Sequence, residues 1–158
     1  MNDALRLVPQ KLPKAAFWAG YTGLIPQIIA GILALSGAEY RWTGLAAAYG
    51  YAAFIFSFLG GMWWGVGVST RKAGVDAGPI IALAVAPSLI AFISYLPWIW
   101  GWEWPGPSMA WIGLFLMLSP LADRWLSRKC DLPEGWMKLR WHLSLGLGGL
   151  TFLLAALA

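Results

Sequence analysis

The stretch Thr43–Val66, TGLAAAYGYAAFIFSFLGGMWWGV, contains no acidic or basic residue over its whole length. A helix needs about 20 consecutive apolar residues to cross the roughly 30 Å hydrocarbon core of a bilayer. Five such runs predict five membrane-spanning helices, the other four being Ala15–Leu35, Pro79–Trp98, Gly106–Leu121 and Trp141–Leu157. The first of them along the chain, Ala15–Leu35, has about 21 residues and is longer than the apolar region of a signal peptide, so we expect that it is not cleaved off.

The composition supports a membrane protein. Hydrophobic residues make up 59% of the 158 residues and charged residues 11%, whereas a soluble domain is about half apolar and a quarter charged. The runs are continuous rather than alternating, which disfavours a lipid-facing barrel. We therefore expect an all-α integral membrane five-helix bundle, with residues 1–158 forming a single domain in contact with the lipid bilayer.

The basic residues lie on alternate connections between the runs. Of the eleven Lys and Arg residues, only Arg41 lies in the first or third connection. Because Lys and Arg are enriched in cytoplasmic loops, this asymmetry predicts an N-in/C-out topology. No basic stripe is formed, so the net charge of +4 does not indicate a nucleic-acid partner. The remaining basic residues are Arg6, Lys11, Lys14, Arg71, Lys72, Arg124, Arg128, Lys129, Lys138 and Arg140.

Small residues in the second run suggest close helix packing. Gly61 and Gly65 are four residues apart, a spacing that lets another helix approach, either in this chain or in a second copy. The same glycines could instead open a pocket walled by Trp63 and Trp64, since small-molecule pockets combine aromatic walls with few polar groups. Within the chain, the expected partner face on the last run contains Gly146 and Gly149.

Polar residues near mid-span form a second candidate group. At 1.5 Å per residue, Gln27 lies about 18 Å into the first run, and Ser57 and Ser88 reach comparable depths. Polar groups at this depth need partners, so the three residues could join helices or line a cavity. Kinks are also expected within three runs, at Pro26, Pro87 and Pro120. The combined candidate ligand-binding residues are Gln27, Ser57, Gly61, Trp63, Trp64 and Ser88.

Candidate docking residues lie outside the runs. Tryptophan is abundant, with twelve residues, and anchoring at the headgroup level explains most of them. The connection Ala122–Arg140 is the longest and most charged, so we expect it to contact cytoplasmic partners and to expose Cys130 to thiol reagents from that side. The candidate docking residues are Trp100, Trp102, Asp123, Arg124, Trp136 and Arg140.

No residue pattern indicates catalysis. Paired acids, clustered histidines and an activated nucleophile are all missing, and the single histidine, His142, has no companions for a metal site. Ionisable residues are also missing from the span centres, which disfavours an ion channel or a proton-coupled transporter. We therefore predict a protein that is not an enzyme and has no catalytic residues, metal or cofactor.

Four blocks of sequence resemble those of a known family. They are Gly23–Pro26, Tyr51–Gly65, Ala86–Leu89 and Leu132–Arg140, and Asp123 is similar to the acid that ends the fourth span in relatives. Their pattern resembles an uncharacterised domain-of-unknown-function family of small multi-span membrane proteins, common in proteobacteria, with a mitochondrial transmembrane relative in animals. The resemblance implies a multi-pass location in the bacterial inner membrane, but no established activity. Trp63 departs from the pattern, since relatives often carry His or Arg there.

Two functional hypotheses follow. The first is an accessory or assembly partner of a larger inner-membrane complex, which the small size and the basic loop favour. The second is a binder or transporter of an apolar small molecule, such as a quinone, lipid or tetrapyrrole, in a Trp-walled, Gly-lined pocket. Self-association through the Gly61/Gly65 face is compatible with either hypothesis.

Overall fold

The computed structural model describes residues 11–70 and 74–158. The predicted all-helical class is confirmed: these residues form no strand, and an isolated bridge joins Lys11 to Glu134. Arg6, Arg71 and Lys72 lie outside the described residues. The helices are α1 (Lys14–Thr22), α2 (Ile25–Leu35), α3 (Ala38–Ser69), α4 (Gly78–Ile99), α5 (Gly106–Lys129) and α6 (Trp136–Ala155).

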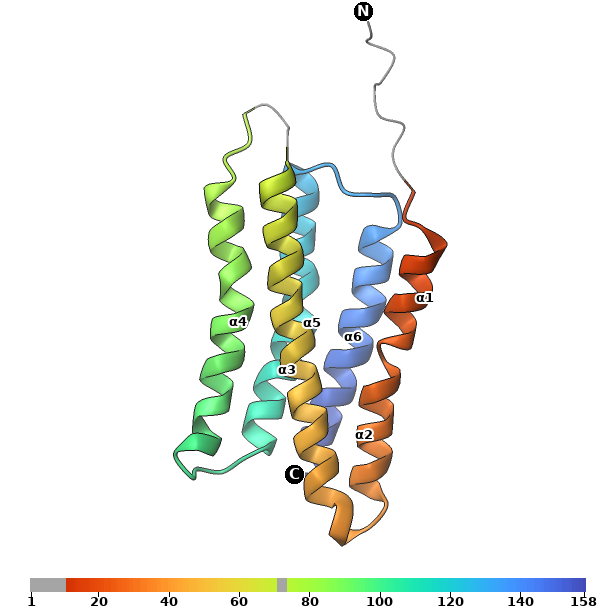
Figure 1. Cartoon of the computed structure of the whole chain (residues 1–158), viewed down its shortest axis with the longest axis vertical. Coiled ribbons are helices and arrows are strands. Elements are labelled where there is room, and N and C mark those ends of the chain that lie inside the picture. Colours follow the sequence, from red (N-terminus) through yellow and green to blue (C-terminus); the bar gives the residue numbers. More distant parts are fainter. Residues whose placement is uncertain (1–10, 71–73) are drawn as a thin grey trace, which may run out of the picture.

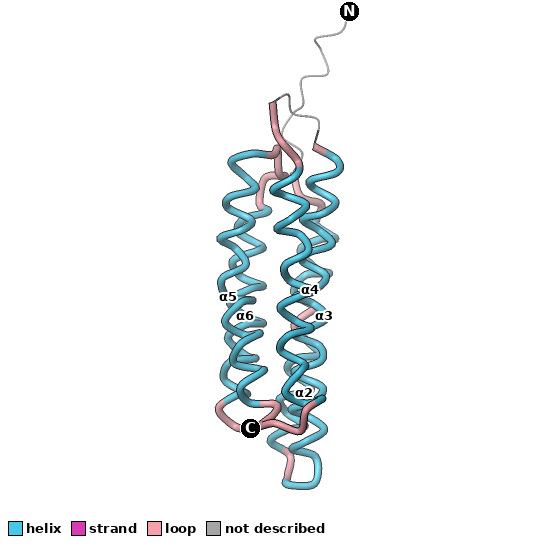
Figure 2. The backbone as a smooth tube through the Cα atoms, turned by 90° about the vertical axis from the view of Figure 1, so that its left-hand side faces the viewer, coloured by secondary structure: helices cyan, strands magenta, loops and turns pink. Residues whose placement is uncertain are grey.

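The helices run up and down along one long axis, as Figures 1 and 2 show. Contacts are most extensive between α5 and α6, between α3 and α4, and between α2 and α3. The start of α1, the α3–α4 connection and the α5–α6 connection all lie at one end, which we call the basic end. Its exposed cations among the described residues are Lys11, Lys14, Arg124, Arg128, Lys129 and Lys138.

The first predicted span is two helices rather than one kinked helix. α1 ends at Thr22 and α2 begins at Ile25, with Pro26 in its first turn. Proline has no N–H to donate to the preceding turn, so the helical hydrogen bonding is interrupted there. The Tyr51 hydroxyl of α3 donates to the Gly23 carbonyl and satisfies a backbone group at the break. In contrast, Pro87 and Pro120 lie inside continuous helices.

Three segments of the described chain are long and apolar enough to cross a membrane by length and composition: Lys14–Leu35, Ala38–Ser69 and Gly78–Ile99. At most 44% of the residues in their apolar windows are buried inside the protein. Large apolar side chains therefore cover the outer surface, such as Phe54 at 77% exposed. An apolar surface of this extent requires lipid or partners rather than water. The fourth and fifth predicted spans, in α5 and α6, do not meet the same criteria of length and composition, so their crossing of the membrane stays a prediction.

The predicted loop Ala122–Arg140 is wrong in extent. α5 continues to Lys129 and α6 already begins at Trp136, so most of this segment is helical. Gly135 makes the turn into α6 with a φ of 89°, a conformation that favours glycine. Two residues of the predicted loop, Asp123 and Arg140, consequently lie on helix faces that are buried in the interior.

Close helix contacts do occur at glycines, but not at the predicted pair. A Cβ added to Gly60 would come closer than 3.0 Å to the Ala84 carbonyl oxygen of α4, and Gly113 similarly approaches Gly148 between α5 and α6. A Cβ added to Gly61 or Gly65 would meet nothing within 4 Å. The expected packing of these two glycines on another helix of this chain, at Gly146 and Gly149, is therefore wrong. Gly61 and Gly65 face outward.

Candidate functional site

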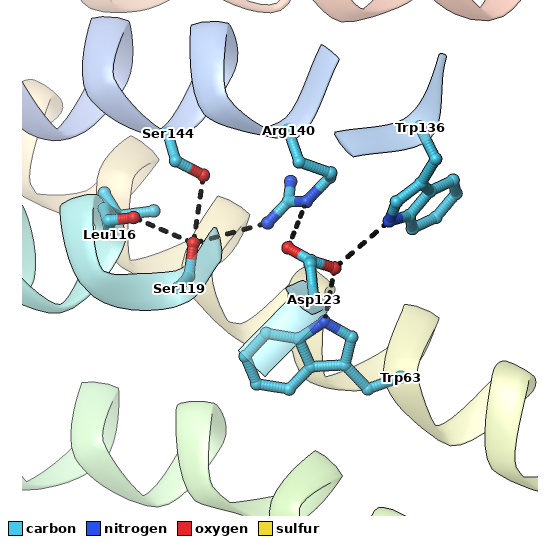
Figure 3. A network of polar contacts seen from close by, with 7 residues as sticks. All are labelled: Trp63, Leu116, Ser119, Asp123, Trp136, Arg140 and Ser144. Carbon is cyan, nitrogen blue, oxygen red and sulfur yellow. Dashed lines mark hydrogen bonds and ion pairs between the residues drawn. The ribbon is translucent and has the colours of Figure 1, made fainter. Parts of the chain in front are cut away.

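A buried carboxylate lies at the junction of three helices near the basic end (Figure 3). Asp123 of α5 is 0% exposed. Its Oδ1 accepts hydrogen bonds from Trp63 Nε1 of α3 at 3.1 Å and from Trp136 Nε1 of α6 at 3.3 Å. Its Oδ2 accepts one from Arg140 Nε at 2.7 Å, which is also an ion pair. One carboxylate thus joins α3, α5 and α6.

The network continues through two serines toward the middle of the protein (Figure 3). Arg140 Nη2 donates to Ser119 Oγ at 3.3 Å, and Ser119 Oγ lies 3.0 Å from Ser144 Oγ. Ser119 uses its single hydroxyl hydrogen on the Leu116 carbonyl at 2.8 Å, so Ser144 must donate to Ser119. We call the group Trp63, Ser119, Asp123, Trp136, Arg140 and Ser144 the Asp123 network.

The Asp123 network joins three helices through a buried ion pair. The carboxylate accepts three N–H groups and balances the charge of Arg140, so both charges are stabilised in a low-dielectric interior. Removing one partner of such a buried pair costs about 3–5 kcal/mol. No group of three His, Cys, Asp or Glu residues that could hold a metal ion occurs in the described part of the chain.

These contacts overturn several predicted assignments. Asp123, Trp136 and Arg140 are not a docking surface, because Asp123 and Arg140 are buried and Trp136 donates inward. Trp63 is 3% exposed and bonds to Asp123, whereas Trp64 is 47% exposed, so the two do not wall a common pocket. The sequence does contain a pattern that indicates this network, namely a four-residue spacing. It places Ser119 and Asp123 on one face of a helix, and Trp136, Arg140 and Ser144 on one face of another. Treating the segment as a loop concealed it.

A first surface groove lies between α3 and α4, with a volume of about 510 Å³. Trp104, from the connection between α4 and α5, stands at its aromatic end, with ring centroids 5.2 Å from both Trp42 and Tyr49 and 6.1 Å from Trp98. Small residues line it along the helices: Ala46, Gly50, Ala53 and Ala91. We call it the aromatic groove.

Polar residues without protein partners line the aromatic groove. Trp104 is one of the lining residues, and its Nε1 is buried and has no hydrogen-bond partner among the described residues. Ser57 and Ser88 lie together toward the other end, and their hydroxyls form no hydrogen bond with any described residue. Tyr49 is satisfied, because Ser94 donates to the Ala91 carbonyl and so accepts from the Tyr49 hydroxyl at 2.9 Å.

A second groove, of about 390 Å³, lies between α1 and α6 and is bounded by α3 and α5. Its walls are almost entirely apolar and include Gly20, Gly23, Leu143 and Leu147. The exceptions lie at the basic end, where Trp136 and Arg140 of the Asp123 network line it. We call it the α1–α6 groove.

The predicted cluster of Gln27, Ser57 and Ser88 is wrong. Gln27 is 1% exposed, and its Nε2 donates to Thr151 Oγ1 of α6 at 2.9 Å. Its Oε1 is buried without a partner in the described structure. Ser57 and Ser88 share the aromatic groove, while Gln27 joins α2 to α6. Sequence reasoning missed the hydrogen bond between Gln27 and Thr151 and the ring contacts that Trp104 makes with residues of α3. These contacts join parts of the chain that are far apart in the sequence.

The remaining candidate docking residues are on the surface. Arg124 is exposed near the basic end. Trp100 and Trp102 are exposed at the opposite end, with ring centroids 4.9 Å apart. Their role as a docking surface stays a prediction. Cys130 is buried rather than accessible, so the expected labelling of this thiol does not fit the structure.

The apolar outer surface and the span-length helices define a helical membrane protein. The chain belongs to the family described as protein of unknown function (DUF3429), whose model matches residues 12–157. It is similar to transmembrane protein 69 of Xenopus tropicalis, with 32% identity over 85 residues that make up 53% of this chain. The chain covers 33% of that relative's length. No solved structure matches. The resemblance predicted from the sequence blocks is confirmed.

Proposed function

We propose that this protein is a non-enzymatic, multi-pass membrane protein that binds an elongated apolar molecule in the aromatic groove. The observation that carries the proposal is the aromatic groove itself, a cavity of about 510 Å³ with largely apolar walls, whose lining residue Trp104 has a buried Nε1 without a partner among the described residues. A buried donor is costly unless it is paired. An oxygen acceptor at the aromatic end of a bound molecule would satisfy this donor once the Trp104 ring turns its N–H toward the groove.

The dimensions of the groove favour an elongated occupant. From Trp42 to Ser57, α3 advances 15 residues, or about 22 Å at 1.5 Å per residue. Aromatic rings line one end and small residues the middle, which suits a flat or ring-bearing head followed by a slender body. Ser57 and Ser88 offer hydroxyls to a second polar group. A quinone with an isoprenoid tail and a lipid each combine an oxygen acceptor with an extended apolar chain, whereas a tetrapyrrole offers oxygen acceptors on a flat ring.

The proposal assigns no catalytic role to the Asp123 network, because both carboxylate oxygens of Asp123 are already engaged. It also includes five crossings with the basic end in the cytosol of a bacterial inner membrane. Six exposed cations gather at that end among the described residues, against Arg41 at the other. This asymmetry supports an N-in/C-out orientation.

The binding proposal is tested by filling the groove. Gly50 lines it and has nothing within 4 Å of an added Cβ, so Gly50→Leu should fill the groove without moving a helix. Gly61→Leu is the matched control, since Gly61 is equally open on the same helix but lies outside the groove. Small molecules extracted from the purified wild-type protein and both variants would be compared by mass spectrometry.

The expected result is a co-purifying apolar molecule that falls at least tenfold in Gly50→Leu and is unchanged in Gly61→Leu. Equal amounts in wild type and Gly50→Leu, or no such molecule in the wild type, would refute the proposal. A loss in Gly61→Leu alone would also refute it, because Gly61 does not line the aromatic groove.

A second candidate function is an accessory or assembly partner of a larger membrane complex. Gly61 and Gly65 favour it. They are four residues apart on the exposed face of α3, and an added Cβ at either would meet nothing within 4 Å, so a helix of another chain has room to pack there. Purification in mild detergent followed by native electrophoresis tests this. A protein that always migrates alone, with Gly61→Leu behaving as wild type, would contradict it.

A further inference from the structure

The α1–α6 groove exists because of the break in the first span. α1 and α2 both pack on α6, but α2, beyond the break at Gly23 and Leu24, also packs extensively on α3. α1 has no comparable contact with α3, and Ile55, Phe58 and Met62 of α3 line the far wall of the opening. Ala19 and Phe58 are exposed, so the groove opens onto the outer, lipid-facing surface.

The length of the groove suits one leaflet. Along α6 it runs from Trp136 to Leu147, 11 residues or about 17 Å. Half of the roughly 30 Å hydrocarbon core is about 15 Å, the depth that one acyl chain occupies. The groove starts at the basic end and runs inward, which is the path of a lipid chain that enters from that surface.

The polar end of the groove contains unused hydrogen-bond donors. Arg140 is 6% exposed and lines the groove, and its five N–H groups make two hydrogen bonds, to Asp123 and Ser119. The remaining donors of a guanidinium suit phosphate oxygens. Asp123 neutralises the charge of Arg140, so the attraction for an anion must come mainly from neighbouring cations.

Those cations lie at the basic end around the groove but do not line it. Lys11, Lys14 and Lys138 are exposed and close in sequence to the lining residues Leu12 and Leu139. At 100° per residue, Lys14 and Lys138 lie on the faces of α1 and α6 that point away from the groove, so they act on a headgroup through their field and not by direct contact. At the whole basic end, the described residues include six exposed cations and three exposed acids, the acids being Asp76, Asp131 and Glu134. This excess of positive charge is complementary to an anionic headgroup.

We propose that the α1–α6 groove is a binding site for an anionic phospholipid. One acyl chain lies along Gly20, Gly23 and Leu143, and the phosphate lies beside Arg140 at the basic end, where the exposed lysines add a positive field. This site is separate from the aromatic groove and does not depend on the proposed function. It links lipid binding to the Asp123 network, since Trp136 and Arg140 belong to both.

The test uses the full chain, purified in detergent, and native mass spectrometry with added phosphatidylglycerol or phosphatidylcholine of identical acyl chains. Wild type should retain at least threefold more phosphatidylglycerol than phosphatidylcholine. Ala19→Trp should lower retained phosphatidylglycerol at least fivefold, because Ala19 lines the groove and is exposed, so a larger side chain can enter it. The double variant Lys14→Gln/Lys138→Gln should lower the preference for phosphatidylglycerol at least twofold, because two positive charges near the groove are lost.

Gly50→Leu, which fills the aromatic groove, is the matched control and should leave the preference for phosphatidylglycerol over phosphatidylcholine unchanged, because no charged residue lines that groove. This separates failure of the lipid site from failure of the proposed function. Equal retention of the two lipids by wild type, or an unchanged preference in the lysine double variant, would overturn the proposal. The lysine variant changes only exposed side chains, so it gives a result even if Ala19→Trp does not fold.

Discussion

Two neighbouring glycines in α3 provide a matched test of the helix packing. Gly60→Ala places a Cβ closer than 3.0 Å to the Ala84 carbonyl oxygen, a backbone atom that cannot turn aside. The two helices must separate, and overpacking of this kind costs about 1–3 kcal/mol. Gly61→Ala places a Cβ in open space. It should gain up to about 1 kcal/mol, because alanine is a better helix former than glycine.

Both substitutions make the same chemical change in the same helix, so the gain in helix propensity cancels between them. The difference in the free energy of unfolding is then the steric cost alone, about 1–3 kcal/mol, with Gly60→Ala less stable. Unfolding by sodium dodecyl sulfate in mixed micelles, followed by circular dichroism, measures both values. A difference below about 0.5 kcal/mol, which is the usual range for surface substitutions, would refute the placement of Gly60 against α4.

Two further predictions concern buried polar residues, and a third concerns orientation. Asp123→Asn should lower the free energy of unfolding by about 3–5 kcal/mol, because Arg140 is left as an unpaired buried charge. Asp123→Leu/Arg140→Met should recover more than half of that loss, because no unpaired charge remains. Equal losses in the single and the double variant would contradict the ion pair. Gln27→Leu should change the free energy of unfolding by less than about 1 kcal/mol, since it removes one hydrogen bond together with an unpaired buried oxygen. A larger loss in the same unfolding assay would show that the Gln27 Oε1 atom has a partner. In a Cys130→Ala background, Ser127→Cys should react with an impermeant maleimide only from the cytosolic side and Glu103→Cys only from outside, whereas the reverse would invert the proposed topology.

The wild-type thiol cannot replace these introduced cysteines. Cys130 was expected in an accessible loop, but it is 4% exposed at the end of α5. Ser127 and Glu103 are exposed at opposite ends of the protein, so they report on the two sides of the membrane.

The limits of sequence reasoning are clear at the Asp123 network. Its members come from α3, α5 and α6, and Trp63 is 60 positions from Asp123. The spacing within α5 and α6 could place Ser119 with Asp123 and Arg140 with Ser144, because four-residue spacing defines a helix face. No pattern in one sequence could show that these two faces meet, or that Trp63 of α3 completes them.

The second run shows the same limit in a single helix. Its small residues correctly indicated close packing, but the contact is at Gly60 and not at Gly61. One residue corresponds to a rotation of about 100° around the helix axis. The spacing of small residues does not reveal which of them faces α4 when nearly every face of the helix is apolar.

The sequence by itself determined the class of this protein, the helical character of its five apolar runs and the concentration of charge at one end. These properties depend on the transfer of local segments between water and lipid, which composition and charge position control. Only the tertiary structure decided which polar groups are paired, which glycines touch a neighbour and where the two grooves lie. Those depend on the rotation of each helix against the others, and the hydrophobic effect specifies no rotation for a rod that is apolar on all sides.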